Sequence, residues 1–154
     1  MLCHFQNHLH SLKALCIQPD LSQICFQNFW QDVIQQSHEI QSLPHDSWAL
    51  WEPDSYQFLV LLFAALLAKK QVLLPPNRVS DLEKELTEQN IYFLQRQPVS
   101  STQNQSIELN LDDAFLNQAQ IYFYTSGSTG QPKKIPRTLR QLLNEVQGLD
   151  ASFQ

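Results

Sequence analysis

Glycine is scarce in this chain, which has only three glycines in 154 residues. Two of the three, Gly127 and Gly130, lie in the same short segment. Glycine adopts positive φ angles readily and lets the backbone approach a ligand closely. The gathering of a rare residue at one place therefore predicts a loop with special backbone geometry.

Basic residues are also few, because ten Lys and Arg stand against fifteen Asp and Glu, for a formal net charge of −5 at pH 7. This balance disfavours nucleic acid as a partner, since phosphate backbones attract basic surfaces. Charged residues make up 16% of the chain and hydrophobic ones 43%, which excludes a disordered tail. The chain shows no internal repeat and is long enough to bury one modest core.

Long apolar runs are absent. The longest, residues 58–68, is shorter than the ~20 residues that a bilayer span requires, so it predicts a buried helix and no membrane span. The N-terminal residues lack the basic region and apolar core of a signal peptide. The three cysteines, Cys3, Cys16 and Cys25, are odd in number and lack metal-ligand spacing. Together these features indicate the reducing cytoplasm.

Two groups of side chains invite interpretation as metal sites. His4 and His8 could share a helical face near Cys3, but no supporting carboxylates accompany them, so isolated surface histidines are preferred. Asp112 and Asp113 could bind Mg²⁺, yet an apolar run follows them, which favours the cap of a helix or turn. The sequence therefore predicts no metal site held by this chain.

Segments typical of helices and strands alternate along the chain. The expected elements are an amphipathic helix that includes residues 24–34, a strand at 48–51, the buried helix at 58–68, a strand at 72–74, a helix at 80–89, a strand at 91–94, an edge strand at 107–111, an aromatic strand at 122–124 and a final helix after residue 138. Such alternation implies right-handed crossovers. We therefore expect an α/β fold with a mostly parallel sheet.

Residues suited to capping predict where the buried helix begins and ends. Asp54 or Ser55 caps its N-terminus, and Gln57 is the expected partner in a capping box. Lys69 and Lys70 are placed to complement the C-terminal end of the helix dipole. Both ends of this helix are thus predicted from the residues next to them in the sequence.

The later helices carry similar signals. Ser80 and Glu83 form a Ser-x-x-Glu capping box for a helix that Asn90 is expected to stop. Thr138 and Gln141 form a second capping box for the last helix. These pairs predict both helix starts from local sequence alone.

The most informative segment is residues 122–134, where an aromatic strand enters a loop of hydroxyl residues and glycines that ends on lysine. Its hydroxyl side chains belong to Thr125, Ser126, Ser128 and Thr129. Successive backbone N–H groups of such a loop can form an anion nest, and Lys133 adds a positive point charge. These features together suit a polyphosphate.

A Walker A loop is the rival interpretation, and the spacing excludes it. That motif reads G-x-x-x-x-G-K-[ST] and runs directly into a helix, whereas Gly127 and Gly130 are too close together and Gln131 follows the second glycine. Pro132 and Pro136 bias the residues before them toward extended conformations. A strand–loop–strand unit is therefore expected.

Residues 124–133 resemble the phosphate-binding signature of the adenylate-forming (AMP-binding) superfamily, which includes acyl- and aryl-CoA synthetases, luciferases and nonribosomal-peptide adenylation domains. The family pattern, aromatic-Thr-Ser-Gly-[Ser/Thr]-Thr-Gly-x-Pro-Lys-Gly-[Val/Ile], is matched without interruption from Tyr124 to Lys133 and again at Ile135. The chain departs from it at Lys134, where Gly is usual, and at Leu139, where His often follows. The alternative is a Ser/Gly-rich surface turn between two strands.

The resemblance extends to residues 132–142, which look like the AMP-ligases found with aryl-polyene and xanthomonadin-type pigment synthesis. It implies ATP-dependent activation of an aryl or acyl carboxylic acid with Mg²⁺, and transfer to the thiol of CoA or of a phosphopantetheine carrier protein. The residues that it assigns to the ATP phosphates are Thr125, Ser126, Gly127, Ser128, Thr129, Gly130 and Lys133. Lys134 either reinforces their field or is solvated on the other face of the strand, and solvation is preferred.

The resemblance also bears on domain organisation. Family enzymes carry later motifs for adenine, ribose, Mg²⁺ and the reacting oxygens, and none of these follows here, so no catalytic residue is assigned. We expect residues 1–154 to be the N-terminal portion of the large adenylation domain, without the C-terminal domain, from a truncated gene, a split gene or a deliberately shortened chain. The alternatives to an enzyme are a non-catalytic nucleotide-binding remnant and one half of a split enzyme that needs a partner chain.

Overall fold

The computed structural model describes residues 16–17, 23–24, 26–98, 111–125 and 133–152. A five-stranded sheet has the order β5 (Tyr92–Phe93), β3 (Ser47–Ala49), β4 (Gln71–Leu74), β6 (Gln120–Thr125) and β7 (Lys133–Thr138). The first four strands in this order run parallel, and β7 is antiparallel to β6. Strands β1 (Cys16–Ile17) and β2 (Gln23–Ile24) form a separate two-stranded antiparallel sheet. The expected α/β fold with a mostly parallel sheet is confirmed.

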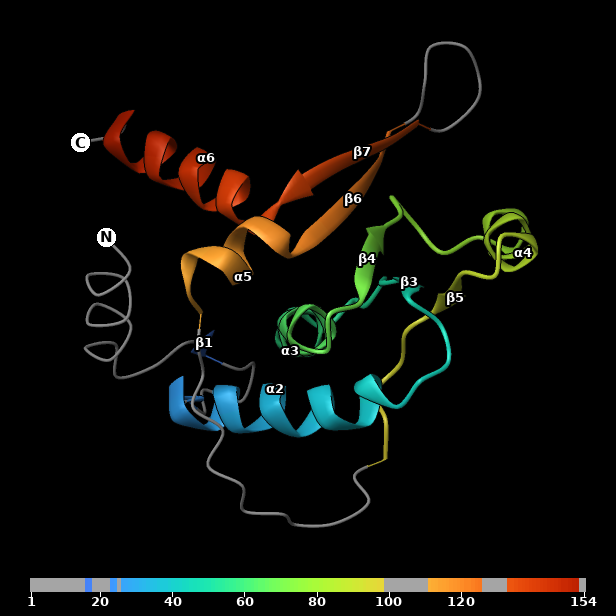
Figure 1. Cartoon of the computed structure of the whole chain (residues 1–154), viewed down its shortest axis with the longest axis horizontal. Helices are drawn as coiled ribbons and strands as arrows, with labels where there is room; N and C mark the ends of the chain where they lie inside the picture. Colours follow the sequence, from blue (N-terminus) through green and yellow to red (C-terminus); the bar gives the residue numbers. More distant parts are fainter. Residues whose placement is uncertain (1–15, 18–22, 25, 99–110, 126–132, 153–154) are drawn as a thin grey trace.

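Helices cover both faces of the sheet, as Figure 1 shows. They are α2 (Phe26–Gln41), α3 (Ser55–Leu67), α4 (Ser80–Glu88), α5 (Asp113–Gln118) and α6 (Leu139–Ser152). Helix α3 lies between α2 and the sheet, while α4 belongs to the opposite side. Within β4, Val72 joins the larger apolar core of α2 and α3, and Leu73 joins the smaller core of α4. This alternation is the period-2 pattern of a strand buried on both faces.

Helix α3 is the buried helix that the apolar run predicts. Asp54 is its N-cap, and the Asp54 carboxylate accepts a hydrogen bond from the Gln57 backbone N–H at 2.7 Å. The other half of the predicted capping box is wrong, because the Asp54 N–H donates to Glu52 Oε1 at 3.1 Å. The Gln57 side chain instead accepts from Arg96 at 3.1 Å.

No helix of the described ranges is long and apolar enough to cross a membrane.

Helices α3 and α4 end in the same backbone motif. Lys69 and Asn90 follow the two helices with positive φ angles of 59° and 58°. After α3, the Lys69 N–H donates to Leu66 O at 3.0 Å and the Lys70 N–H to Ala65 O at 2.9 Å, which is the Schellman pattern. The prediction that Asn90 stops α4 is confirmed, since Asn tolerates the left-handed conformation.

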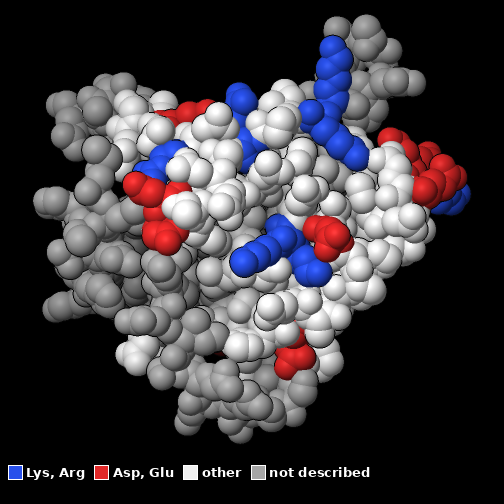
Figure 2. All heavy atoms as spheres, in the orientation of Figure 1, with Lys and Arg blue, Asp and Glu red and all other residues white. Residues whose placement is uncertain are grey.

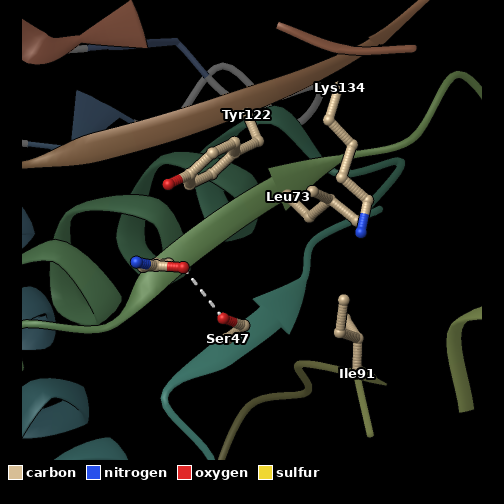
Figure 3. A pocket seen from close by; sticks show the side chains of 6 residues that line it. Ser47, Leu73, Ile91, Tyr122 and Lys134 are labelled. Carbon is tan, nitrogen blue, oxygen red and sulfur yellow. Dashed lines mark hydrogen bonds between the residues drawn. The ribbon is translucent and has the colours of Figure 1, made fainter. Parts of the chain in front are cut away.

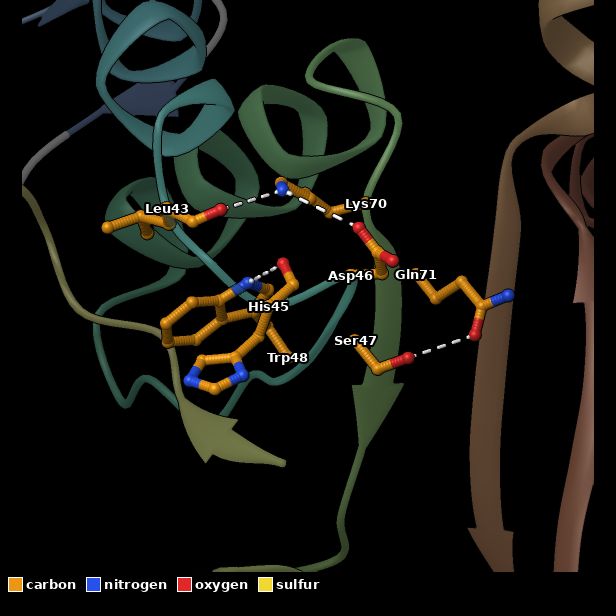
Figure 4. A network of polar contacts seen from close by, with 7 residues as sticks. All are labelled: Leu43, His45, Asp46, Ser47, Trp48, Lys70 and Gln71. Atoms are coloured by element: carbon orange, nitrogen blue, oxygen red, sulfur yellow. Dashed lines mark hydrogen bonds and ion pairs between the residues drawn. The ribbon is translucent and has the colours of Figure 1, made fainter. Parts of the chain in front are cut away.

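Lys70 has a different role from the one predicted (Figure 4). Its Nζ donates to the Leu43 carbonyl at 2.9 Å and lies 3.9 Å from Asp46 Oδ1, so it holds the segment between α2 and β3 and does not serve the end of α3. The Lys70 side chain is only 9% exposed, whereas that of Asp46 is 97% exposed. Water screens the carboxylate, so the hydrogen bond to Leu43 is the stronger contact.

The capping box predicted for α4 is also wrong. Val79 is the N-cap and makes no side-chain hydrogen bond, while Ser80 is already helical. The Glu83 carboxylate pairs with Arg78, with 3.1 Å between Glu83 Oε1 and Arg78 Nη2. The edge strand predicted at 107–111 falls outside the described ranges except for Leu111, which is not in a strand.

Gln36 is the buried polar residue of α2 and is 1% exposed. Its amide accepts from the Gln97 N–H at 2.8 Å and donates to the Gln97 carbonyl at 2.9 Å. The side chain therefore pairs with the backbone of a segment 61 residues away as a neighbouring strand would. This pair holds the chain after β5 against α2.

We expect Gln36→Leu to lower the free energy of unfolding by about 1–3 kcal/mol, because it leaves the Gln97 N–H and carbonyl without a buried partner. Denaturant unfolding measures this difference. Gln31→Leu, an exposed glutamine of the same helix, is the matched control. Equal stability of the two variants would contradict the role given to Gln36.

Lys69→Gly should raise the free energy of unfolding by about 1 kcal/mol, because glycine adopts the positive φ at this position without the penalty of a Cβ. Thermal and denaturant unfolding of the variant test the prediction. Asn90→Gly should change stability less, since Asn already tolerates this conformation. A loss of stability in Lys69→Gly would show that the lysine side chain itself stabilises the turn.

Candidate functional site

Strands β6 and β7 form a hairpin around the predicted phosphate loop. They pair without a break from Gln120 opposite Thr138 to Thr125 opposite Lys133. The strand–loop–strand unit expected from the prolines is thus confirmed at both ends. The five predicted loop residues between them, Ser126, Gly127, Ser128, Thr129 and Gly130, lie outside the described residues.

The hairpin brings Thr125 and Lys133 together at one edge of the sheet. Strand β6 runs parallel to β4, with Leu74, the last residue of β4, opposite Phe123. Thr125 therefore lies beyond the carboxyl end of β4, on the edge where open α/β sheets bind their ligands. Two of the seven predicted phosphate-binding residues are placed in this way as register partners.

The opposite end of the hairpin is fixed by α5 and α6. The Leu139 N–H donates to the Ala119 carbonyl at 3.0 Å, which joins the start of α6 to the start of β6. The predicted capping box of α6 is confirmed: the Thr138 N–H donates to Gln141 Oε1 at 2.9 Å, and the Gln141 N–H to Thr138 Oγ1 at 3.2 Å. These bonds hold the hairpin on regular elements, which makes a loop at its other end easier to position.

Asp112 and Asp113 stabilise the same end of the hairpin. Asp112 is the N-cap of α5 and accepts from the Phe115 N–H at 2.8 Å, as predicted. Asp113 pairs with Arg140 of α6. The described residues contain no group of three or more His, Cys, Asp or Glu side chains able to hold a metal ion. His4, His8 and Cys3 lie outside them.

Lys134 does more than extend into solvent. Its Nζ donates to Gln89 Oε1 at 2.7 Å and lies 5.9 Å from the centre of the Tyr124 ring. Although the residue is exposed, the preference for a merely solvated lysine is wrong. Sequence analysis missed Gln89 and Tyr124 as its partners. The one signal for these contacts in the sequence was the lysine at residue 134, where the family usually has glycine. Gln89 is 45 residues away in sequence, so no local pattern relates it to Lys134.

A shallow pocket of about 130 Å³ lies beside Lys134 on the α4 side of the sheet (Figure 3). It is lined by Ser47, Gln71, Leu73, Ile91, Tyr122 and Lys134. Ser47 Oγ donates to Gln71 Oε1 at 3.0 Å, and the Tyr122 hydroxyl donates to Gln120 Oε1 at 2.7 Å. The pocket is smaller than the ~300 Å³ at which ligand sites begin, so it does not by itself accommodate a nucleotide.

Charge is divided between the hairpin and α4. Figure 2 shows basic side chains over β7 and a group of acidic side chains over α4. Lys133 and Lys134 are adjacent in β7, whereas Arg137 lies 3.6 Å from Glu145 of α6. Lys133 and Lys134 thus place positive charge near the loop end of the hairpin. An anion is favoured there and disfavoured over α4.

Comparisons with known proteins show similarity in fold. No protein-family model and no curated protein matches the chain. Among solved structures, the chain is similar to McyG A-PCP complexed with phenylalanyl-adenylate, with a TM-score of 0.51 and 17% sequence identity. The match covers 88% of this chain and 27% of that chain. The fold therefore matches part of that protein, and this chain spans about a quarter of its length.

Tyr124 makes the stability of the folded chain depend on pH. Its side chain is 9% exposed, and its pKa is raised above 10.0, first by burial and second by the negative charge of Glu85. The folded state thus favours the neutral phenol, and its contribution to stability is complete below pH 10. As pH rises above 10, the unfolded chain ionises first and this contribution is lost.

We expect Tyr124→Phe to reduce the fall of the free energy of unfolding with pH above pH 10, because it removes the ionising group. Denaturant titrations between pH 8 and about pH 11 give the two slopes. Tyr92→Phe, which changes an exposed tyrosine at the opposite edge of the sheet, is the control. Identical slopes in the wild type and Tyr124→Phe would contradict this assignment.

Proposed function

We propose that this chain supplies the phosphate-binding part of an adenylate-forming enzyme, which uses ATP to activate a carboxylic acid as an acyl-adenylate. One observation carries the proposal. The hairpin sets Thr125 beside Lys133 at the carboxyl edge of the parallel strands, at the two ends of a segment that resembles the family signature. The fold supports it further, because it matches part of a protein solved with phenylalanyl-adenylate.

In this proposal the loop residues hold the β- and γ-phosphates of ATP while the carboxylate attacks the α-phosphate and pyrophosphate leaves. The enzyme contributes positioning and charge neutralisation on the leaving group. Hydroxyls and backbone N–H groups surround the phosphates, and Lys133 adds positive charge. The group consists of Thr125, Ser126, Gly127, Ser128, Thr129, Gly130 and Lys133. When bound, Mg²⁺ would neutralise further phosphate charge.

We assign residues 1–154 to the N-terminal portion of a large adenylation domain in the cytoplasm. The coverage of 27% of the matched solved chain is consistent with such a portion. From the resemblance of residues 132–142 we propose an aryl or acyl acid as substrate, and the wider family suggests CoA or a carrier-protein thiol as acceptor. The remaining ligands of adenine and ribose then come from other parts of the enzyme.

A second candidate is one half of a split enzyme. Val146 and Leu149 on α6 are 62% and 60% exposed, although both are apolar. Apolar surface of this kind marks places where other protein segments pack. A separately encoded chain that carries the later motifs would cover it, whereas a nucleotide-binding remnant would need no such partner.

Carboxylate-dependent ATP–pyrophosphate exchange tests the proposed function. We would assay the chain and its full reading frame with benzoic, cinnamic and fatty acids. Exchange should fall about 100-fold in Lys133→Ala, because a preorganised charge on the leaving group is removed, while the circular dichroism spectrum is retained. Lys84→Ala, an exposed lysine of α4, is the control.

Two other results would favour the alternatives to this proposal. Absence of exchange in both forms, with folding confirmed, would leave a non-catalytic remnant. Exchange that appears only after a separately encoded chain is added would establish the split enzyme.

A further inference from the structure

The loop end of the β6–β7 hairpin projects beyond the sheet. The last pair between β4 and β6 is Leu74 with Phe123, yet β6 and β7 continue to the pair Thr125 and Lys133. Past Phe123 the hairpin is therefore a two-stranded ribbon, and such ribbons are marginally stable alone in water. Its ends need support from another element if the loop is to hold a fixed geometry.

Helix α4 provides two contacts to this ribbon. Tyr124 packs in the smaller apolar core, to which α4 contributes the fully buried Leu86. Lys134, the register partner of Tyr124, donates from Nζ to Gln89 Oε1 at 2.7 Å. Figure 3 shows the Lys134 side chain extending past Leu73 toward Ile91, across the face of β4. One pair of the ribbon is thus joined to α4 on both strands.

Gln89 is itself held in a defined position. It is the C-cap of α4, and its N–H donates to the Leu86 carbonyl at 3.0 Å. The next two residues complete the Schellman motif, since the Asn90 N–H donates to Thr87 O and the Ile91 N–H to Leu86 O, both at 2.9 Å. The amide that meets Lys134 therefore extends from a rigid turn.

We infer that Lys134 is a positioning residue of the phosphate loop, tying the ends of β6 and β7 to the C-terminal end of helix α4 through Gln89. This inference rests on the proposed function. Lys133 and Thr125 are the neighbours of Lys134 and Tyr124, so fixing the second pair fixes the ends from which the loop extends. Ordering these ends before ATP binds lowers the entropy cost of binding. A glycine at residue 134 would make neither contact.

Calorimetric titration of the 154-residue chain with tripolyphosphate and Mg²⁺ tests this role. Lys134→Gln and Gln89→Leu should each weaken binding about three- to tenfold, from the loss of one charged hydrogen bond and, for the lysine, one cation–π contact. The double variant should be no weaker than the weaker single variant, because both changes break one link. Lys134→Arg should restore binding, and Lys84→Gln controls for the loss of one positive charge.

The outcomes separate this inference from the proposed function. If Lys133→Ala abolishes binding while Lys134→Gln and Gln89→Leu bind as the wild type does, the link is refuted and the function stands. If Lys134→Gln weakens binding and Gln89→Leu does not, the lysine acts by charge alone and the link is again refuted. A wild-type chain that is folded and binds no tripolyphosphate overturns both.

Amide hydrogen exchange without ligand provides an independent measurement. Exchange at Tyr124, Thr125 and Lys133 should become faster in both Lys134→Gln and Gln89→Leu, since the ribbon loses its attachment to α4. Exchange at Ile121 in the centre of the sheet should not change. Unchanged exchange at the ribbon would overturn the inference even if the binding constants differ.

Discussion

The parallel pairing of β4 with β6 is the constraint on which the rest of this structure depends. It joins Val72 to Ile121 in the centre of the sheet, and both residues are buried in the core under α3. The pairing also decides where β6 ends relative to β4, and so carries Thr125 past the carboxyl edge. Strand β7 then returns Lys133 to the same place. The sheet register therefore sets the place from which the proposed polyphosphate loop extends.

The larger apolar core stabilises the sheet, whereas the smaller apolar core lies next to the candidate site. The larger core packs α2 and α3 against the parallel strands. Beside it, the Gln36 amide hydrogen-bonds the backbone of Gln97. The smaller core beneath α4 lies next to the hairpin and includes Tyr124. Helix α4 therefore links the body of the domain to the candidate site, although it carries acidic side chains that would repel an anion. Among the described residues, Lys133 and Lys134 place positive charge at the loop end of β7, which favours the proposed phosphate site there.

Features decided by neighbouring residues could be predicted from the sequence, and features decided by distant residues could not. The Asp54 cap, the Asn90 stop and the Thr138–Gln141 box all depend on residues within one helical turn. The α4 box failed because the helix begins one residue earlier than predicted, with Val79 as its N-cap and Ser80 already helical. Lys70 and Lys134 meet Leu43 and Gln89, which are distant in sequence, so only the tertiary fold places them together. For the candidate site, the motif and its strand–loop–strand setting were predictable, whereas the support from α4 was not.

We propose above all that the end of the β6–β7 hairpin binds the phosphates of ATP. Amide chemical shifts of the chain, recorded during titration with ATP and Mg²⁺, test it residue by residue. We expect saturable shifts at Thr125, at Lys133 and in residues 126–130, with little change in α2, and loss of these shifts in Lys133→Ala. Saturable shifts that fall elsewhere, or shifts that persist unchanged in Lys133→Ala, would contradict it.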